Sequence, residues 1–192
     1  MDLDDIDWKI IRQLQLDGRK TFKEVGEAVG FTGLGARRRV KNLLEQEVIR
    51  ASVLINTEAL DLRLAIIMLE MESADAIRET LDRYKECPRV INFFTTMGSY
   101  NLIALVMAED QGTLESESME QCALRSGKGI RRSEFYPIGK VHHSTFLPLR
   151  AYTPRETGDI TPCGTDCKEC PPFRDQKCVG CPSMSYYRGP LR

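Results

Sequence analysis

The sequence predicts an α+β protein with three parts: an N-terminal helix-turn-helix unit of winged-helix type, a ferredoxin-like βαββαβ domain, and a small cysteine-rich metal-binding tail. Three observations predict it. Helical periodicity dominates residues 1–50, strand and helix patterns alternate through residues 62–149, and residues 150–192 carry five cysteines and six prolines with little periodicity. Residues 51–61 are expected to form a linker strand between the first two parts.

Bulk composition limits the class of protein. A chain of 192 residues with 42% hydrophobic content suits two modest folded domains and an appendage. No apolar run reaches about 18 residues, so no membrane span is expected. The first residues are acidic, whereas a secretory signal begins with basic residues, and this predicts a cytoplasmic protein.

The first helix is predicted over residues 4–16. Ile6, Ile10 and Leu14 recur at a spacing of four residues and form one apolar stripe. Asp4 stands where an N-cap residue is expected, because its short carboxylate can accept hydrogen bonds from free backbone amides.

Two further helices follow. Thr21 and Glu24 have the spacing of a capping box at the start of the second helix, and Gly30 is suited to a left-handed C-terminal cap. Thr32 is the expected N-cap of a third helix that runs to about residue 47. Two helices joined by so short a turn are typical of a helix-turn-helix.

The third helix carries a local positive charge. Residues 32–44 hold three arginines and one lysine but no acidic residue. A solvated basic face is the ordinary interpretation of such a run, but its place on the second helix of the pair favours contact with DNA. Arg39 lies nearer the core side, and an ion pair within the domain is expected for it. The candidate DNA contacts are Thr32, Leu34, Arg37, Arg38, Lys41 and Asn42.

The middle of the chain has a regular order of elements. Strands are predicted over residues 49–56, 64–71, 90–97, 102–108 and 132–141, and helices over residues 73–86 and 113–124. Apart from the first strand, this order is βαββαβ.

Both faces of the predicted sheet are apolar. In residues 64–71 the hydrophobic side chains occupy odd and even positions alike. Two helices can cover only one face of a four-stranded antiparallel sheet, so the other face needs a partner. A second copy of the chain is the favoured partner, and the tail or the linker strand is the alternative.

Five of the seven cysteines cluster in the tail, which is typical of metal binding in a protein without a disulfide scaffold. Two Cys-x2-Cys pairs suit a zinc thiolate cage, although the seven-residue gap between them is short. The first three cysteines and two Cys-Pro steps resemble an iron–sulfur ligand run instead. Zinc and an iron–sulfur cluster both stay open, with candidate ligands Cys163, Cys167, Cys170, Cys178 and Cys181.

The chain resembles the Lrp/AsnC family of transcription regulators over residues 3–146. The motifs that carry the resemblance follow the family's order and spacing: Leu3-Asp4-Asp5-Ile6-Asp7, Asp17-Gly18-Arg19, Val29-Gly30-Phe31-Thr32, Leu43-Leu44-Glu45 and Val48-Ile49, with Gly98-Ser99-Tyr100-Asn101 similar to the family's Gly-x-Tyr-Asp loop.

The resemblance implies a homodimer that pairs through its sheets, often assembles further and binds double-stranded DNA near promoters. It also implies a small-molecule effector, such as an amino acid, near Gly98, Tyr100 and Asn101. Asn101 departs from the family pattern because it lacks the carboxylate that could meet an α-amino group.

An enzyme on the same scaffold is the alternative function. Siroheme decarboxylases also resemble Lrp-type proteins, and His142 or His143 would then be the proton donor. A decarboxylase has no use for the basic third helix, so we expect a regulator and not an enzyme.

Overall fold

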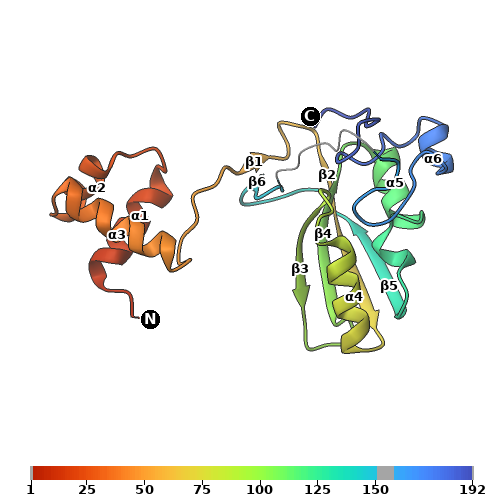
Figure 1. Ribbon diagram of the computed structural model, residues 1–192, viewed down its shortest axis with the longest axis horizontal. Coiled ribbons are helices and arrows are strands. Elements are labelled where there is room, and N and C mark those ends of the chain that lie inside the picture. Colours follow the sequence, from red (N-terminus) through yellow and green to blue (C-terminus); the bar gives the residue numbers. More distant parts are fainter. Residues whose placement is uncertain (1, 151–157, 192) are drawn as a thin grey trace. The chain divides into compact units, whose positions relative to one another are not determined.

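The computed structural model describes residues 2–150 and 158–191. The chain divides into two compact units, Met1–Val53 and Leu54–Arg192 (Figure 1). Within the described ranges, every helix is too short or too polar to cross a lipid bilayer.

The N-terminal unit consists of three helices, α1 (Asp5–Leu16), α2 (Phe22–Val29) and α3 (Gly33–Glu45). Their apolar stripes meet in one small core. Its fully or nearly fully buried members are Ile10, Ile11, Val25, Ala36, Val40 and Leu43. The amphipathic spacing of each helix therefore decides how the three pack.

Side chains cap each of these helices at its N-terminus. Asp4 accepts a hydrogen bond from the backbone N–H of Asp7 at 2.8 Å, and the two residues form a capping box. Thr21 and Glu24 form a second one, as the sequence predicted. The Thr32 hydroxyl accepts from the N–H of Gly35 at 3.1 Å. These oxygens satisfy amides that the helix itself leaves free.

The second unit has the ferredoxin-like arrangement. Its elements are β2 (Arg63–Met71), α4 (Ala74–Tyr84), β3 (Val90–Thr95), β4 (Leu102–Ala108), α5 (Gln111–Met119) and β5 (Ile130–Pro137). The strand order is β3-β4-β2-β5, and neighbouring strands are antiparallel. This confirms the predicted βαββαβ fold.

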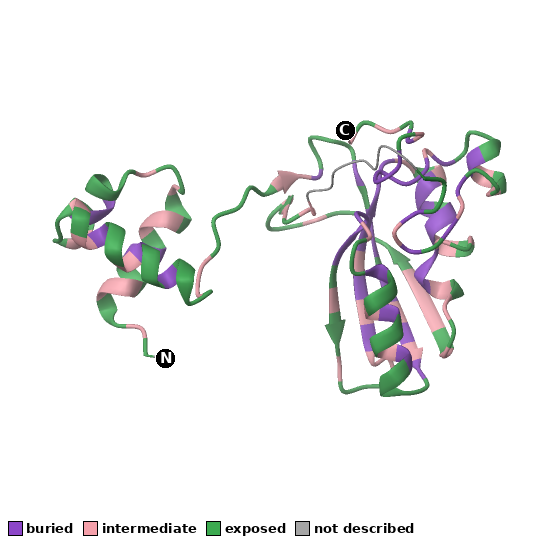
Figure 2. Ribbon diagram, in the orientation of Figure 1, coloured by how far each residue is buried: buried purple, intermediate pink, exposed green. Residues whose placement is uncertain are grey.

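The two faces of the sheet are buried differently. On one face Ala65, Ile67 and Leu69 of β2 are almost completely buried in the main core, which α4 and α5 complete. On the other face, one end is covered by residues 138–149 and Leu191. Ile66, Phe94 and Tyr136 on the rest of the sheet remain exposed. Much of the edge strand β3 is exposed as well (Figure 2).

Three expected elements differ most from the structure in their bounds. The strand predicted over residues 49–56 is wrong for most of its length: only β1 (Ile55–Asn56) is a strand, paired with β6 (Phe146–Leu147). Val53 is 79% exposed, and a strand needs a neighbour to accept its hydrogen bonds. The helix expected over residues 113–124 is α5 followed by a 3-10 turn, Leu124–Ser126, and the last strand ends at Pro137 instead of residue 141.

The described part of the tail packs onto the second unit. It contains one short helix, α6 (Pro171–Arg174), and a small apolar cluster that includes Phe173 and Met184. A side chain at Gly112 of α5 would place its Cβ 2.1 Å from the carbonyl oxygen of Lys177. Only glycine therefore permits the backbone of the tail to lie this close to α5.

Candidate functional site

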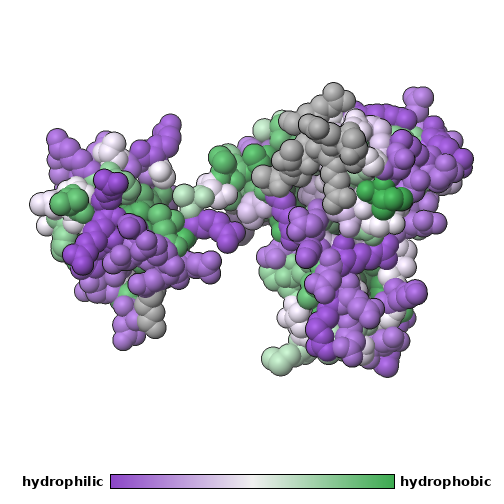
Figure 3. Space-filling model, viewed as in Figure 1, coloured by the Kyte–Doolittle hydropathy of each residue, from purple (hydrophilic) through white to green (hydrophobic). Residues whose placement is uncertain are grey.

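The outer face of α3 gathers the residues predicted to contact DNA. All six are exposed: Thr32, Leu34, Arg37, Arg38, Lys41 and Asn42. Ala36, Val40 and Leu43 occupy the buried side of the same helix. In the view of Figure 3 the surface of the N-terminal unit is mainly hydrophilic. Leu34 is an exception, 77% exposed at the first turn of α3, where an apolar side chain is available to a ligand.

Arg39 has a different role from its neighbours. Its guanidinium donates to Asp4 and Asp7 of α1, each at 2.8 Å, and lies 5.3 Å from the centre of the Phe31 ring. Hydrogen bonds to the two carboxylates raise the pKa of Arg39 above its ordinary value. The backbone N–H of Asp7, and then Arg39, lower the pKa of Asp4. The predicted internal ion pair of Arg39 is therefore present, and it joins α3 to the start of α1.

Gly26 of α2 is a residue that the sequence analysis missed. A Cβ at this position would lie 2.7 Å from the carbonyl oxygen of Phe31 and 2.9 Å from that of Thr32. Gly26 thus allows the turn between α2 and α3 to fold tightly against α2. A glycine in the middle of a strongly amphipathic eight-residue helix was the available signal, since glycine there costs about 1 kcal/mol unless packing requires it.

The turn between β3 and β4 holds the predicted effector residues. Gly98 is exposed, and the hydroxyl of Tyr100 is buried. Burial, and then the neighbouring carboxylate of Glu134, raise the pKa of Tyr100 to about 12. The side chain of Asn101 is fully used: its Oδ1 accepts from the N–H of Met71 at 2.7 Å and its Nδ2 donates to the carbonyl of Met71 at 2.9 Å. An aspartate could not make the second bond, which explains why asparagine suits this position.

A cavity in the second unit is lined by cysteines. It has a volume of about 40 Å³, and its wall includes all five tail cysteines together with Cys87 and Cys122. Within residues 2–150 and 158–191, no three histidine, cysteine or acidic side chains converge closely enough to share one metal ion. Burial raises the pKa of Cys87 to about 12 and also raises the pKa of Cys122, so both are neutral thiols in the wall.

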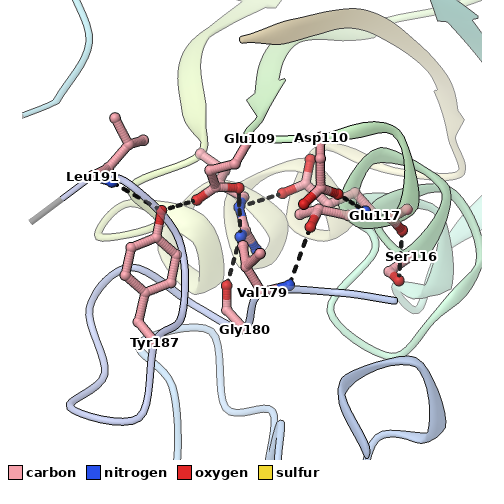
Figure 4. Close-up of polar contacts among 11 residues, drawn as sticks. Glu109, Asp110, Ser116, Glu117, Val179, Gly180, Tyr187 and Leu191 are labelled. Atoms are coloured by element: carbon pink, nitrogen blue, oxygen red, sulfur yellow. Dashed lines mark hydrogen bonds and ion pairs between the residues drawn. The ribbon is translucent and has the colours of Figure 1, made fainter. Parts of the chain in front are cut away.

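A buried ion-pair network joins the tail to the domain beside this cavity (Figure 4). The guanidinium of Arg89 lies 2.7 Å from Glu109 and 3.1 Å from Glu117, and it also donates to the carbonyl of Gly180. The hydroxyl of Tyr187 donates to Glu109 at 2.6 Å. The sequence analysis did not single out these residues, since nothing in the local sequence marks two carboxylates and an arginine as neighbours.

The histidine pair lies apart from the candidate sites described above. His142 and His143 are both exposed, in the segment after β5. Neither lines the cysteine cavity or the β3–β4 turn.

Comparisons with known proteins agree with this arrangement. Residues 3–44 match the AsnC-type helix-turn-helix domain. The chain is 31% identical to the transcriptional regulator Ptr1 of Methanocaldococcus jannaschii over 56% of its own length and 74% of the relative. It is 31% identical to the leucine-responsive regulatory protein of Rhizobium meliloti over 63% and 80% of the two chains, and 28% identical to regulator FL11 of Pyrococcus furiosus over 77% and 97%.

Solved structures share the fold. Escherichia coli AsnC is 18% identical, with a TM-score of 0.65 over 79% of this chain and 97% of AsnC. A Neisseria meningitidis transcriptional regulator, solved as a complex with L-Met, is 24% identical, with a TM-score of 0.67 over 77% and 97% of the two chains. The curated relatives are named as transcription regulators and not as enzymes, which removes the support for a decarboxylase. From its helix-turn-helix, its βαββαβ domain and these relatives, the chain belongs to the Lrp/AsnC family of transcription regulators.

Proposed function

We propose that this protein is a sequence-specific DNA-binding transcription regulator that recognises double-stranded DNA through α3. One observation carries the proposal: Arg37, Arg38 and Lys41 are exposed on the outer face of α3, while Arg39 is held inside the domain. Three cations of α3 therefore face outward, while Arg39 keeps the ion pair that fixes the helix.

The face of α3 has side chains for both kinds of DNA contact. Arginine and lysine bind phosphate oxygens, which fixes the position of the helix on the duplex. Asn42 can pair with the edge of an adenine, and Leu34 can contact a thymine methyl group. The second helix of a helix-turn-helix docks in the major groove, and we assign α3 to that groove.

A homodimer is the proposed form of the regulator. The uncovered part of the sheet exposes Ile66, Phe94 and Tyr136, which favours a second copy as its partner. A dimer would present two α3 helices to two half-sites. Assembly beyond the dimer is implied only by the family resemblance.

A small-molecule effector is proposed at the β3–β4 turn. The buried hydroxyl of Tyr100 and the exposed Gly98 support it. Arg132 lies 5.5 Å from the Tyr100 ring and is paired with Glu134 at 2.7 Å, so the carboxylate of an effector would take the place of Glu134 at this cation. Asn101 would support the turn from behind, because its side chain is engaged by Met71. The complex of the N. meningitidis regulator with L-Met suggests an amino acid or a similar metabolite.

The tail is proposed to hold a metal centre, either zinc or an iron–sulfur cluster. The five cysteines proposed as ligands, Cys163, Cys167, Cys170, Cys178 and Cys181, line one cavity although the sequence spreads them over 19 residues, and this supports the proposal. The centre would add a metal or redox signal to the effector signal.

We infer that the protein acts in the cytoplasm, where the DNA of a prokaryotic cell lies.

Mapping of bound DNA across the genome of the source organism tests the regulator assignment. The expected result is a limited set of promoter sites that share a pseudo-palindromic sequence. The same sites, made as duplex oligonucleotides, should shift in a gel with purified protein and resist excess unrelated DNA. Uniform occupancy without a shared sequence would contradict the assignment.

A further inference from the structure

The cysteine cavity is built from two separate parts of the chain. Cys87 follows α4 and Cys122 follows α5, whereas the other five cysteines belong to the tail. All seven cysteines of the sequence therefore line one space. The space has a volume of about 40 Å³, and thiols make up much of its wall.

The seven thiols are not equivalent. Cys163, Cys167, Cys178 and Cys181 are buried, each with less than about a tenth of its surface exposed. Cys170 is only partly buried, and its sulfur lies 4.0 Å from a carboxylate oxygen of Glu120. Cys87 and Cys122 pack against the main core of the sheet. Cys163 is a buried member of the same core, and Cys170 packs beside Cys167 and Cys181. Burial alone therefore distinguishes the four tail thiols from the other three.

The distances between thiols distinguish a zinc site from an iron–sulfur cluster. In a tetrahedral zinc site each Zn–S bond is about 2.3 Å, so the four sulfurs lie about 4 Å from one another around a single point. No three cysteine, histidine or acidic side chains in the described ranges converge in that way. An iron–sulfur cluster is held differently, because each thiolate binds a different corner of a group several Å wide. Thiols that surround a common cavity without converging suit a cluster.

The surroundings of the four thiols also suit a cluster. The hydroxyl of Thr161 lies 3.2 Å from the sulfur of Cys163, and that of Thr165 lies 3.7 Å from it. In the thiol form Cys163 donates to Thr165. Once Cys163 has lost its proton, the Thr165 hydroxyl can turn to donate to the thiolate, and hydrogen bonds to sulfur are among the features by which proteins adjust a cluster. Arg89 donates to the carbonyl of Gly180, inside the Cys178–Cys181 loop, and so fixes this loop against the domain.

We propose that this cavity takes an iron–sulfur cluster held by the thiolates of Cys163, Cys167, Cys178 and Cys181. The inference rests on the metal centre in the proposed function and names its type and ligands. On assembly each of the four thiols releases one proton to solvent as its sulfur binds an iron atom. When ferrous and ferric iron are supplied in equal amounts with sulfide, they form a cluster of two ferrous and two ferric ions, so no oxidant is required. Cys170, Cys87 and Cys122 would be wall residues and not ligands.

Anaerobic reconstitution of the full-length protein tests this. One sample receives equal amounts of ferrous and ferric iron with sulfide, and a parallel sample receives zinc alone; both are desalted before analysis. The expected result is a protein that retains several iron and sulfide ions per chain with an absorption band near about 400 nm. C167S and C178S should lose most of the band and the bound iron, whereas C170S and C122S should retain them.

Each contrary result has a separate meaning. Retention of one zinc ion per chain, with no iron and sulfide, would overturn the cluster but keep a metal centre. Retention of neither would overturn both. A cluster that survives C167S and C178S but is lost in C170S would overturn the ligand set. If a serine variant does not fold, the iron, sulfide and zinc contents of the unmodified protein still decide the type of centre. A gel shift on the same samples tests the regulator assignment independently.

Discussion

Two adjacent arginines of α3 have different roles in the N-terminal unit. Arg38 is exposed, whereas Arg39 is 29% exposed at its side chain and bonded to Asp4 and Asp7. Arginine is therefore available to a ligand at position 38 and stabilises the fold at position 39. Their separation follows from the rotation of about 100° per residue along a helix.

The Arg39→Ala variant should lose stability, and Arg38→Ala should not. Removing Arg39 leaves two carboxylates near the start of α1 without their cation, so we expect the Tm of the N-terminal unit to fall by roughly 5 °C. Arg38→Ala is the matched control and should melt like the unmodified protein. Thermal melts followed by circular dichroism at helical wavelengths measure both. Equal melting of the two variants would show that the ion pair of Arg39 does not stabilise the fold.

Asn101 is expected to support the β3–β4 turn through its two bonds to Met71. Asn101→Asp removes the donor and sets a carboxylate against a carbonyl oxygen, which should lower the free energy of unfolding by about 1–3 kcal/mol. Denaturant unfolding of the second unit measures it. Ser99→Ala, on the exposed tip of the same turn, is the control and should have little effect. If Asn101→Asp is as stable as Ser99→Ala, the two bonds of Asn101 to Met71 do not stabilise the turn.

Glu117 should make the second unit less stable as pH rises. Burial raises the pKa of Glu117 to about 8, against the opposing effect of Arg89. The folded state therefore holds the proton more tightly than the unfolded state, whose pKa is near 4.5. Stability from this group is largest below about pH 4.5 and is lost as pH rises through about 8.

Denaturant unfolding of metal-free protein across that pH range measures the effect. Glu117→Gln cannot ionise, so its free energy of unfolding should change less with pH than that of the unmodified protein. A variant with an unchanged pH dependence would mean that Glu117 is already ionised at neutral pH in the fold.

At the scale of elements, capping residues and hydrophobic patterns predicted the helices and strands correctly wherever the packing of the folded chain agreed with them. The helix caps at Asp4, Thr21 and Thr32 are all present, and the strand expected over residues 102–108 has these bounds. Residues 49–54 failed as a strand because β propensity cannot form a strand without a neighbour. The cysteine motif marked the five tail cysteines that line the cavity, but the Arg89 network and the approach of Cys87 and Cys122 depend on contacts between distant segments.

Gly26 gives a test of the turn between α2 and α3. Gly26→Ala would gain helix propensity but force its Cβ against two carbonyl oxygens, and we expect a net loss of about 1–3 kcal/mol. Gly18→Ala is the control, since its Cβ would meet only ordinary contact at 3.7 Å. Chemical unfolding of both variants compares them. If Gly26→Ala is as stable as Gly18→Ala, the close approach seen at this turn is not required.

At the scale of the whole molecule, the chain combines a DNA-binding unit with a regulatory unit that has two separate candidate sites. The β3–β4 turn lies at one end of the sheet, and the cysteine cavity lies at the other, where α5 and the tail meet (Figure 1). Arg89, Glu109 and Tyr187 tie the tail to the domain.

The salt dependence of DNA affinity tests the central claim, that α3 presents its cations to duplex DNA. Affinity for a promoter site should fall steeply with salt concentration, because binding releases counterions from phosphates. Arg38→Ala and Lys41→Ala should each weaken binding and lower the slope of log affinity against log salt by about 1. Lys9→Ala removes the same charge from an exposed position on α1 and should leave the slope unchanged. Slopes that are equal in all three variants and the unmodified protein would contradict the claim.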